Sequence, residues 1–298
     1  MKIIISGASG LVGRRLLKAL AGDGHQMHVL SRHAGTNLPP GIGLSVWDPL
    51  KGEPPADCLD GADAVIHLAG ERVDQRWTPE AKQRIRDSRV TGTRNLALAL
   101  ARLARRPEVL ICASATGFYG SRGDEILTET SAPGTGFLPE LCQAWEQEAR
   151  FLESLKMRVV LLRTGLALDN RGGALPRMLP PFRLGVGGRL GDGRQWVSWI
   201  HLQDLVRLIQ FALRQPVEGP LNGVAPNPVT NSDFTRTLAA ALKRPAILPA
   251  PRFALRMLLG EMSELLLASQ RVLPQAPEEA GFKFNFPLLG PALADVLK

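Results

Sequence analysis

The chain has 298 residues, of which 45% are apolar, and a formal net charge of +8 at pH 7. This length suits one large α/β domain with a smaller one, and the apolar fraction is ordinary for a soluble globular protein. The sequence has no run of about eighteen apolar residues and no secretory leader pattern, so we expect neither a membrane contact nor export. Cys58, Cys112 and Cys142 lie far apart in the sequence, and no cysteine and histidine have the spacing of metal ligands. We therefore predict a cytoplasmic protein without disulfides or metal.

The positive charge is concentrated in one segment. Between Arg76 and Arg106 there are nine basic and two acidic residues. This segment predicts one long helix, and its charge would suit a phosphorylated cofactor or an anionic substrate, or simply form a solvated face. No zinc-finger spacing or aromatic RNA-binding signature accompanies it, so we do not expect nucleic-acid binding.

The first thirty-two residues predict a strand, a glycine turn, a helix and a second strand. Lys2–Ser6 is a short β-branched run, typical of a strand buried on both faces. Glycines follow at spacings of three, and apolar residues then recur at helical spacing up to the next strand at 27–30. Glycine lets a ligand approach the main chain, and a helix start offers unpaired N–H groups and a positive dipole end, which suits a pyrophosphate. The predicted contacts are Gly7, Ser9, Gly10, Leu11, Val12 and Gly13.

The end of the second strand indicates which dinucleotide binds. Sites that prefer NAD usually place Asp or Glu there, whereas this chain has Ser31 and Arg32. An arginine can pair bidentately with the 2′-phosphate of NADP, which a carboxylate would repel. We therefore predict NADP as the cofactor. The alternative for Arg32 is a solvated surface arginine.

Four further apolar runs predict strands, at residues 44–47, 62–70, 109–113 and 158–163. They alternate with helices, one starting at Thr78 and one covering about 139–155. Six strands that alternate with helices predict a Rossmann-type, doubly wound parallel sheet with right-handed crossovers. Ligands of such sheets lie beyond the carboxyl ends of the strands. We therefore expect the cofactor to lie against Leu68, Ala69 and Gly70.

The composition changes beyond residue 170. Fourteen of the 23 prolines lie there, together with a glycine-rich loop at 185–193 that lacks the flanking pattern of a phosphate loop. Residues 196–201 predict a short strand, and Asp204 opens a helix. We divide the chain into a dinucleotide-binding domain, 1–170, to which some later segments could return, and a smaller irregular α/β substrate domain, 171–298, over the carboxyl edge of the sheet.

Several motifs resemble those of the extended short-chain dehydrogenase/reductases of the nucleotide-sugar epimerase type. They are the glycine turn at 7–13 and the segments 67–70, 91–96, 118–120 and 191–204. Residues 76–78, 88–89, 179–185, 221–226 and 270–274 resemble a narrower branch of epimerase family proteins with its own C-terminal module. The resemblance implies NADP held by the glycine turn, by Ser31 and Arg32, by Leu68 and Ala69, and by Arg89 on the long helix.

One departure from that family concerns the chemistry. The wider family acts through a Tyr and a Lys four residues apart, in which the lysine lowers the pKa of the tyrosine. Here the expected positions carry Leu138 and Cys142, and no lysine occurs between Lys82 and Lys156. The resemblance implies an NADP-dependent oxidoreductase or epimerase-like enzyme acting on a small polar or sugar-like substrate. The missing couple favours the alternative, an NADP-binding redox sensor or interaction protein.

Three residues remain as candidates for the site. Ser114 could hydrogen-bond a substrate carbonyl, and Tyr119, the single tyrosine, could donate a proton during reduction. Without a lysine the pKa of Tyr119 should stay near ~10. The alternative for Tyr119 is a packing residue whose hydroxyl finds one partner. Arg163, at the end of the sixth strand, is a further candidate for cofactor binding. The sequence leaves the substrate and the oligomeric state open.

Overall fold

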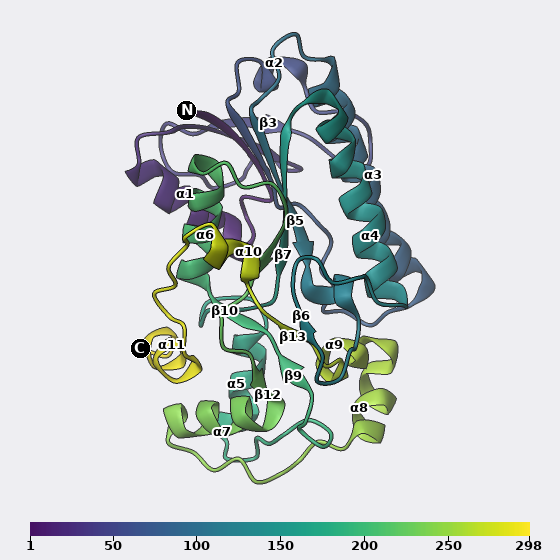
Figure 1. Ribbon diagram of the computed structural model, residues 1–298, viewed down its shortest axis with the longest axis vertical. Coiled ribbons are helices and arrows are strands. Elements are labelled where there is room, and N and C mark those ends of the chain that lie inside the picture. The colour runs from purple at the N-terminus through teal and green to yellow at the C-terminus, as the bar shows by residue number, and fades with distance from the viewer.

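A seven-stranded sheet forms the centre of the molecule in the computed structural model, which describes residues 1–298 (Figure 1). All neighbouring strands are parallel, in the order β11-β7-β5-β4-β1-β2-β3. The strands are β1 (Lys2–Ser6), β2 (Gln26–Ser31), β3 (Gly43–Val46), β4 (Ala64–His67), β5 (Val109–Ala115), β7 (Arg158–Thr164) and β11 (Gly219–Gly223). The predicted Rossmann-type, doubly wound α/β fold is confirmed.

Helices cover both faces of this sheet (Figure 1). On one face lie α1 (Leu11–Gly22) and α6 (Leu202–Arg214), and on the other α3 (Pro79–Arg102) and α4 (Phe137–Arg150) with the short α2 (Ala56–Leu59) and η2 (Phe151–Leu155). Ile3 and Ile5 pack with α1 and α6, whereas Ile4 packs on the opposite side with α3 and α4. The run Ile3–Ile5 supplies both cores because successive strand residues point to opposite faces. No helix is long and apolar enough to span a bilayer.

The long basic helix begins where the sequence predicts. The Thr78 hydroxyl accepts the N–H of Ala81 at 3.2 Å, and Pro79 occupies the first helical position. Three of its basic residues form ion pairs with carboxylates elsewhere in the chain: Lys82 with Glu261, Arg94 with Glu148, and Arg102 with Glu53. Just beyond the helix, Arg105 pairs with Asp63. These pairs fit the interpretation of a solvated, ion-paired face.

Two elements from beyond residue 170 rejoin the main sheet. Helix α6 crosses its face, and β11 then pairs in parallel with β7 from Gly219 to Gly223. The sheet therefore has seven strands where six were expected, because β11 adds to its edge beside β7. The sequence Gly-Pro-Leu-Asn-Gly carries little β propensity, so only its place beside β7 makes it a strand.

A smaller, irregular layer lies below the sheet in Figure 1. Strand β8 (Leu166–Leu168) pairs with β10 (Trp199–His201), and β9 (Trp196–Val197) pairs with β12 (Val229–Thr230). Helices α5 (Leu175–Arg183), α7 (Asn231–Leu242) and α11 (Leu289–Val296) pack around Trp199 and Phe234. The strand predicted at 196–201 is thus broken at Ser198, whose hydroxyl donates to the Gln270 carbonyl at 2.6 Å.

Residues 269–273, the C-terminal strap, run between these two parts of the molecule. They contain β13 (Arg271–Val272), which pairs in parallel with β6 (Ile126–Leu127) beyond the one-turn helix η1 (Thr116–Tyr119). The Ser269 N–H donates to the Ser121 hydroxyl at 3.1 Å, and the Val272 N–H donates to the Ser198 hydroxyl at 2.9 Å. The strap therefore fastens the loop after β5 to the lower layer, and α10 (Gln275–Glu279) follows it.

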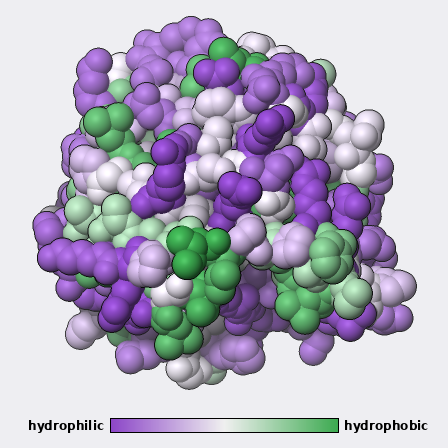
Figure 2. Space-filling model, turned by 90° about the horizontal axis from the view of Figure 1, so that it is seen from below, coloured by the Kyte–Doolittle hydropathy of each residue, from purple (hydrophilic) through white to green (hydrophobic).

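Helix α8 (Arg252–Leu259) packs loosely on the rest of the lower layer. None of its residues is buried, and Phe253, Met257 and Leu258 are largely exposed. Seen from below, the molecule shows groups of apolar residues among hydrophilic ones (Figure 2). The chain continues through η3 (Gly260–Ser263) and α9 (Glu264–Leu267) into the strap.

Candidate functional site

The glycine turn joins β1 to α1 at the carboxyl edge of the sheet. Gly7 has a φ of +75°, and a Cβ there would lie 2.5 Å from the Leu68 carbonyl carbon and 2.7 Å from the Ala69 nitrogen. A Cβ on Gly13 would lie 2.4 Å from the Gly7 carbonyl oxygen. Both positions therefore require glycine, because β1, α1 and the end of β4 approach one another without room for a side chain.

The start of α1 presents free backbone donors. Its N-cap residue, Gly10, offers no side-chain cap, and the first turn carries no acidic residue. The first N–H with a main-chain acceptor is that of Arg14, which donates to the Gly10 carbonyl at 3.0 Å, so the N–H groups of residues 11–13 have no acceptor in the protein. These donors and the positive dipole end suit a pyrophosphate. Ser9 lies exposed beside them.

The end of β2 carries a free cation. The Ser31 hydroxyl lies 2.7 Å from that of Thr36 and accepts the His33 N–H at 3.2 Å, which orders the turn that follows the strand. Arg32 is exposed and makes no ion pair. A guanidinium without a carboxylate partner at this edge fits the 2′-phosphate of NADP.

A second cation lies at the end of β4. The Arg89 guanidinium packs against Gly70, where a Cβ would lie 3.1 Å from its central carbon. It donates to the carbonyls of Glu71 at 2.9 Å and Ile85 at 3.3 Å, and it lies 5.1 Å from the centre of the Trp145 ring. Burial lowers the pKa of Arg89, which makes no ion pair with a carboxylate. A shielded, unneutralised cation favours an anionic ligand at this edge.

Ser114 and Tyr119 lie in a buried polar cluster. The Tyr119 hydroxyl is fully buried, donates to Asn222 Oδ1 at 2.7 Å and accepts from Arg163 Nη1 at 3.0 Å. The Ser114 hydroxyl donates to Glu146 Oε1 at 2.7 Å. Burial raises the pKa of Tyr119, although the nearby Arg163 opposes this shift. Both hydroxyls are committed to internal partners, so this geometry supports the packing alternative for Tyr119 and gives Ser114 no open path to a substrate.

Arg163 belongs to the same buried cluster. Its guanidinium is 3% exposed and makes two bonds of 2.8 Å to the two oxygens of Glu146. It also lies 3.5 Å from the centre of the Phe118 ring and donates to the Glu129 carbonyl at 3.3 Å. Strands β5 and β4 separate β7 from the glycine turn on β1. The cofactor contact predicted for Arg163 does not fit this geometry, because its donors are used inside the protein.

Sequence reasoning missed Glu146 and Asn222, which complete this cluster. A signal for Glu146 exists: it follows Cys142 by one helical turn on the buried face of α4, where a carboxylate needs a partner. Asn222 has no comparable signal. It lies on β11, 103 residues from Tyr119, and only the fold brings the two together.

The positions expected for the Tyr–Lys couple carry no group that titrates near neutral pH. Leu138 and Cys142 of α4 pack against Gly117, where a Cβ would lie 3.4 Å from Leu138 Cβ and 3.8 Å from Cys142 Sγ. Cys142 is buried, and burial raises the pKa of its thiol to about 12. Neither side chain can therefore exchange a proton with a substrate near pH 7.

Residues 3–225 match the profile of the NAD dependent epimerase/dehydratase family. The chain belongs to this family. Residues 250–296 match a second profile, a domain of unknown function named DUF1731. The resemblance seen in the sequence is thus confirmed, including the separate C-terminal module of the branch.

Relatives of this epimerase-family chain match it along nearly its whole length. It is 43% identical over 294 residues to an epimerase family protein of Mycobacterium bovis, covering 98% of this chain and 96% of the relative. It is 39% identical to an Arabidopsis thaliana protein named epimerase family protein SDR39U1 homolog, chloroplastic, covering 100% of this chain and 87% of the relative. The crystal structure of human epimerase family protein SDR39U1 (isoform 2) with NADPH superposes with a TM-score of 0.89 at 34% identity, covering 99% of both chains.

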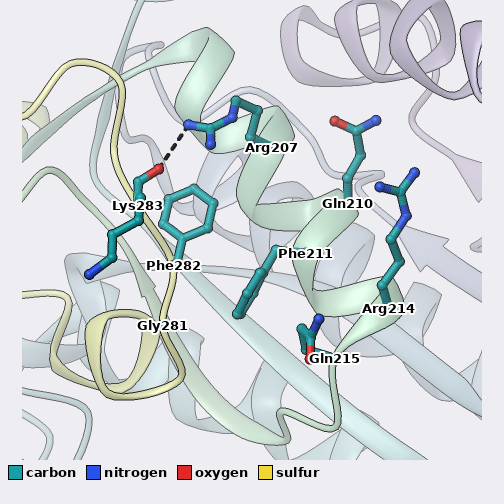
Figure 3. Close-up of a pocket in the computed structure, with 8 residues that line it drawn as sticks. All are labelled: Arg207, Gln210, Phe211, Arg214, Gln215, Gly281, Phe282 and Lys283. Atoms are coloured by element: carbon teal, nitrogen blue, oxygen red, sulfur yellow. Dashed lines mark hydrogen bonds between the residues drawn. The ribbon is translucent and has the colours of Figure 1, made fainter.

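A second pocket of this epimerase-family chain lacks the free arginines found near the glycine turn. It lies between α6 and residues 281–283 and has a volume of about 370 Å³ (Figure 3). Arg207 pairs with the buried Asp204, and Arg214 pairs with Asp23. The side chains of Gln210 and Arg214 point away from the Phe282 ring (Figure 3). Its two arginines are neutralised, and the Lys283 side chain points away from both of them (Figure 3), so we place the candidate site at the glycine turn.

Proposed function

We propose that this chain binds NADPH at the carboxyl ends of β1, β2 and β4 and acts as an NADP-dependent oxidoreductase of the epimerase family. The proposal rests on one observation. At the same edge of the sheet lie the N–H groups of residues 11–13, which have no acceptor in the protein, and Arg32, which has no ion-pair partner. Arg89 and the NADPH in the human relative's crystal support it. The pyrophosphate would bind the start of α1, and Arg32 with Ser31 would hold the 2′-phosphate. Residues 68–70 would let the cofactor lie against the main chain.

The chain's own residues limit the proton chemistry of this proposal. Bound NADPH would supply a hydride, but Leu138 and Cys142 offer no acid or base near neutral pH. The hydroxyls of Ser114 and Tyr119 already donate to buried partners. The accompanying proton would then come from water or from the substrate itself. This favours reduction of an activated carbonyl over epimerisation, which needs a base to remove a hydroxyl proton.

The second candidate function is an NADP-binding redox sensor or interaction protein without turnover. Leu138 and Cys142 favour it, because the two positions of the family's Tyr–Lys couple are filled by side chains that do not titrate near neutral pH. The two candidates share the cofactor site and differ in the fate of the bound NADPH. A sensor would bind NADPH without oxidising it and would bind a partner differently with and without the cofactor.

A paired titration with NADPH and NADH, followed by tryptophan fluorescence, tests the cofactor site. We expect NADPH to bind at least about ten-fold more tightly, or about 1.4 kcal/mol, and Arg32→Ala to remove that preference. Arg86→Ala is the matched control, because Arg86 is also exposed and unpaired but lies on α3. Binding of neither dinucleotide would refute the proposal.

NADPH oxidation with a panel of carbonyl compounds then separates the two functions. Turnover with any carbonyl supports the oxidoreductase, and Tyr119→Phe should leave its rate unchanged because the hydroxyl is buried in the protein. Tight NADPH binding with no oxidation across the panel supports the sensor.

A further inference from the structure

Two segments of the chain form one surface at the end of the molecule farthest from β3 (Figure 1). Residues 183–194 and 243–258, which we call the basal surface, run side by side: the Leu248 N–H donates to the Gly187 carbonyl at 3.3 Å, and Leu190 forms a parallel bridge with Ala250. The second segment ends in α8, at the lower right of Figure 1. None of these residues takes part in the proposed cofactor site.

Apolar side chains project from the basal surface. Leu184, Ile247, Phe253, Met257 and Leu258 are between 69% and 80% exposed. A side chain in a groove is shielded by the groove's walls, so exposure this high means that these residues stand out from the surface. Large apolar side chains exposed together mark an interaction site more often than isolated ones do. Figure 2, the view from below, shows apolar groups bordered by hydrophilic residues.

The charge of the basal surface is almost entirely positive. Its one acidic residue, Asp192, pairs with Arg252. Six exposed basic residues have no ion-pair partner: Arg183, Arg189, Arg194, Lys243, Arg244 and Arg256. Two copies of this surface placed face to face would bring like charges together, which disfavours a symmetric dimer through it. The complementary partner is therefore anionic.

Helix α8 has the residue pattern of a helix that lies in a membrane interface. Phe253 and Met257 are one turn apart on its exposed side, and Arg252 and Arg256 form the adjacent stripe. In such a helix the apolar stripe enters the boundary of the acyl chains while the arginines extend to the headgroups.

A pocket at the rim of the basal surface fits the same kind of ligand. It has a volume of about 490 Å³ and is lined by Arg189, which has no ion-pair partner, and by Arg236, which pairs with Asp233, together with Ser232 and Thr235. Arginines and hydroxyls are the usual partners of a phosphate group. Apart from Ile247, the projecting apolar residues lie outside this pocket.

We propose that the basal surface docks on an anionic lipid bilayer, with α8 in the plane of the interface and a lipid phosphate at the rim pocket. Projecting apolar side chains fit a deformable surface, whereas an acidic peptide needs a groove for its own apolar residues. The sequence led us to expect no membrane contact, but that expectation rested on the lack of a membrane-spanning segment. The contact proposed here is peripheral and needs no such segment. The proposal does not depend on the proposed enzymatic function.

Flotation of the purified full-length protein with vesicles tests this proposal. We expect binding to phosphatidylcholine vesicles that contain phosphatidylglycerol, and binding at least about ten-fold weaker to phosphatidylcholine alone or at high salt. The double variant Met257→Ser/Leu258→Ser should lose about ten-fold or more in affinity for the anionic vesicles. Both side chains are exposed, so its thermal unfolding should match that of the wild type.

Leu50→Ser is the matched control, because Leu50 is 50% exposed and lies in the loop between β3 and α2, outside the basal surface. No flotation with anionic vesicles would overturn the proposal, as would a double variant that binds as well as Leu50→Ser. A solution dimer that dissociates in the double variant would assign the surface to a second copy. Binding to polyglutamate but not to vesicles would assign it to an acidic protein.

Discussion

Replacing Glu146 by Gln removes one charge from the buried cluster on β5, β7 and α4 and leaves the side-chain size unchanged. Glu146 and Arg163 are each 3% exposed and form two bonds of 2.8 Å. An amide in place of the carboxylate turns an N–H₂ group towards one of the Arg163 donors. The guanidinium is then left buried without its paired carboxylate.

The cost of that change follows from the burial of the pair. Removing one partner of a buried ion pair typically destabilises a protein by about 3–5 kcal/mol, because the remaining charge stays desolvated. We expect Glu146→Gln to fall in this range. The melting temperature should fall by roughly 6–10 °C, since each kcal/mol shifts it by about 2 °C in a chain of this length.

Urea unfolding followed by circular dichroism measures this effect, with Glu148→Gln as the matched control. Glu148 lies on the same helix and makes an equally bidentate contact, to Arg94, but this pair is 20% and 54% exposed. Exposed pairs contribute at most about 1 kcal/mol. Equal losses of unfolding free energy in the two variants would refute the reasoning that burial sets the cost.

Two further predictions concern buried titratable groups. His67 is fully buried, and burial lowers its pKa to about 4; because the unfolded chain takes up this proton near 6.5, the free energy of unfolding should fall by about 3 kcal/mol as the pH drops from 6.5 to 4. This loss of unfolding free energy should be missing in His67→Gln. The prediction is contradicted if urea unfolding gives the same loss between pH 6.5 and 4 for both proteins. All three cysteines are buried, and burial raises the pKa of the Cys112 and Cys142 thiols to about 12. Ellman's reagent should therefore label none of them quickly in the native protein and all three in urea, and a fast-reacting native thiol would show that the packing around that cysteine is wrong.

Features that depend on a few neighbouring residues were predictable from the sequence. The glycine turn after β1 and the Thr78 cap of α3 lie where expected, because backbone freedom and capping act within one turn of chain. The alternation of strands and helices likewise fixes the doubly wound fold. The cofactor contacts at Gly7–Gly13, Ser31, Arg32, 68–70 and Arg89, the domain boundary and the cytoplasmic location stay predictions.

Features that depend on distant residues were not predictable in the same way. Arg163 is the last residue of the predicted sixth strand, which suggested a cofactor contact, but Glu146 on the adjacent helix neutralises it. Tyr119 is notable in the sequence as the single tyrosine. Its partner Asn222, however, lies on β11, a strand with almost no sequence signature. Which residue pairs with such a buried side chain can be read only from the folded structure.

The C-terminal strap sets the earliest time at which the loop after β5 can be closed during synthesis on the ribosome. Ser269 closes onto Ser121, which is 148 residues earlier in the chain. At about 5–20 residues per second, the loop after β5 must wait roughly 7–30 s after its own synthesis for its partner to be made. During that interval the hydroxyls and strand edge that the strap covers are open to solvent and to other nascent chains. A chaperone that binds residues 116–127 during translation would protect the protein over that time.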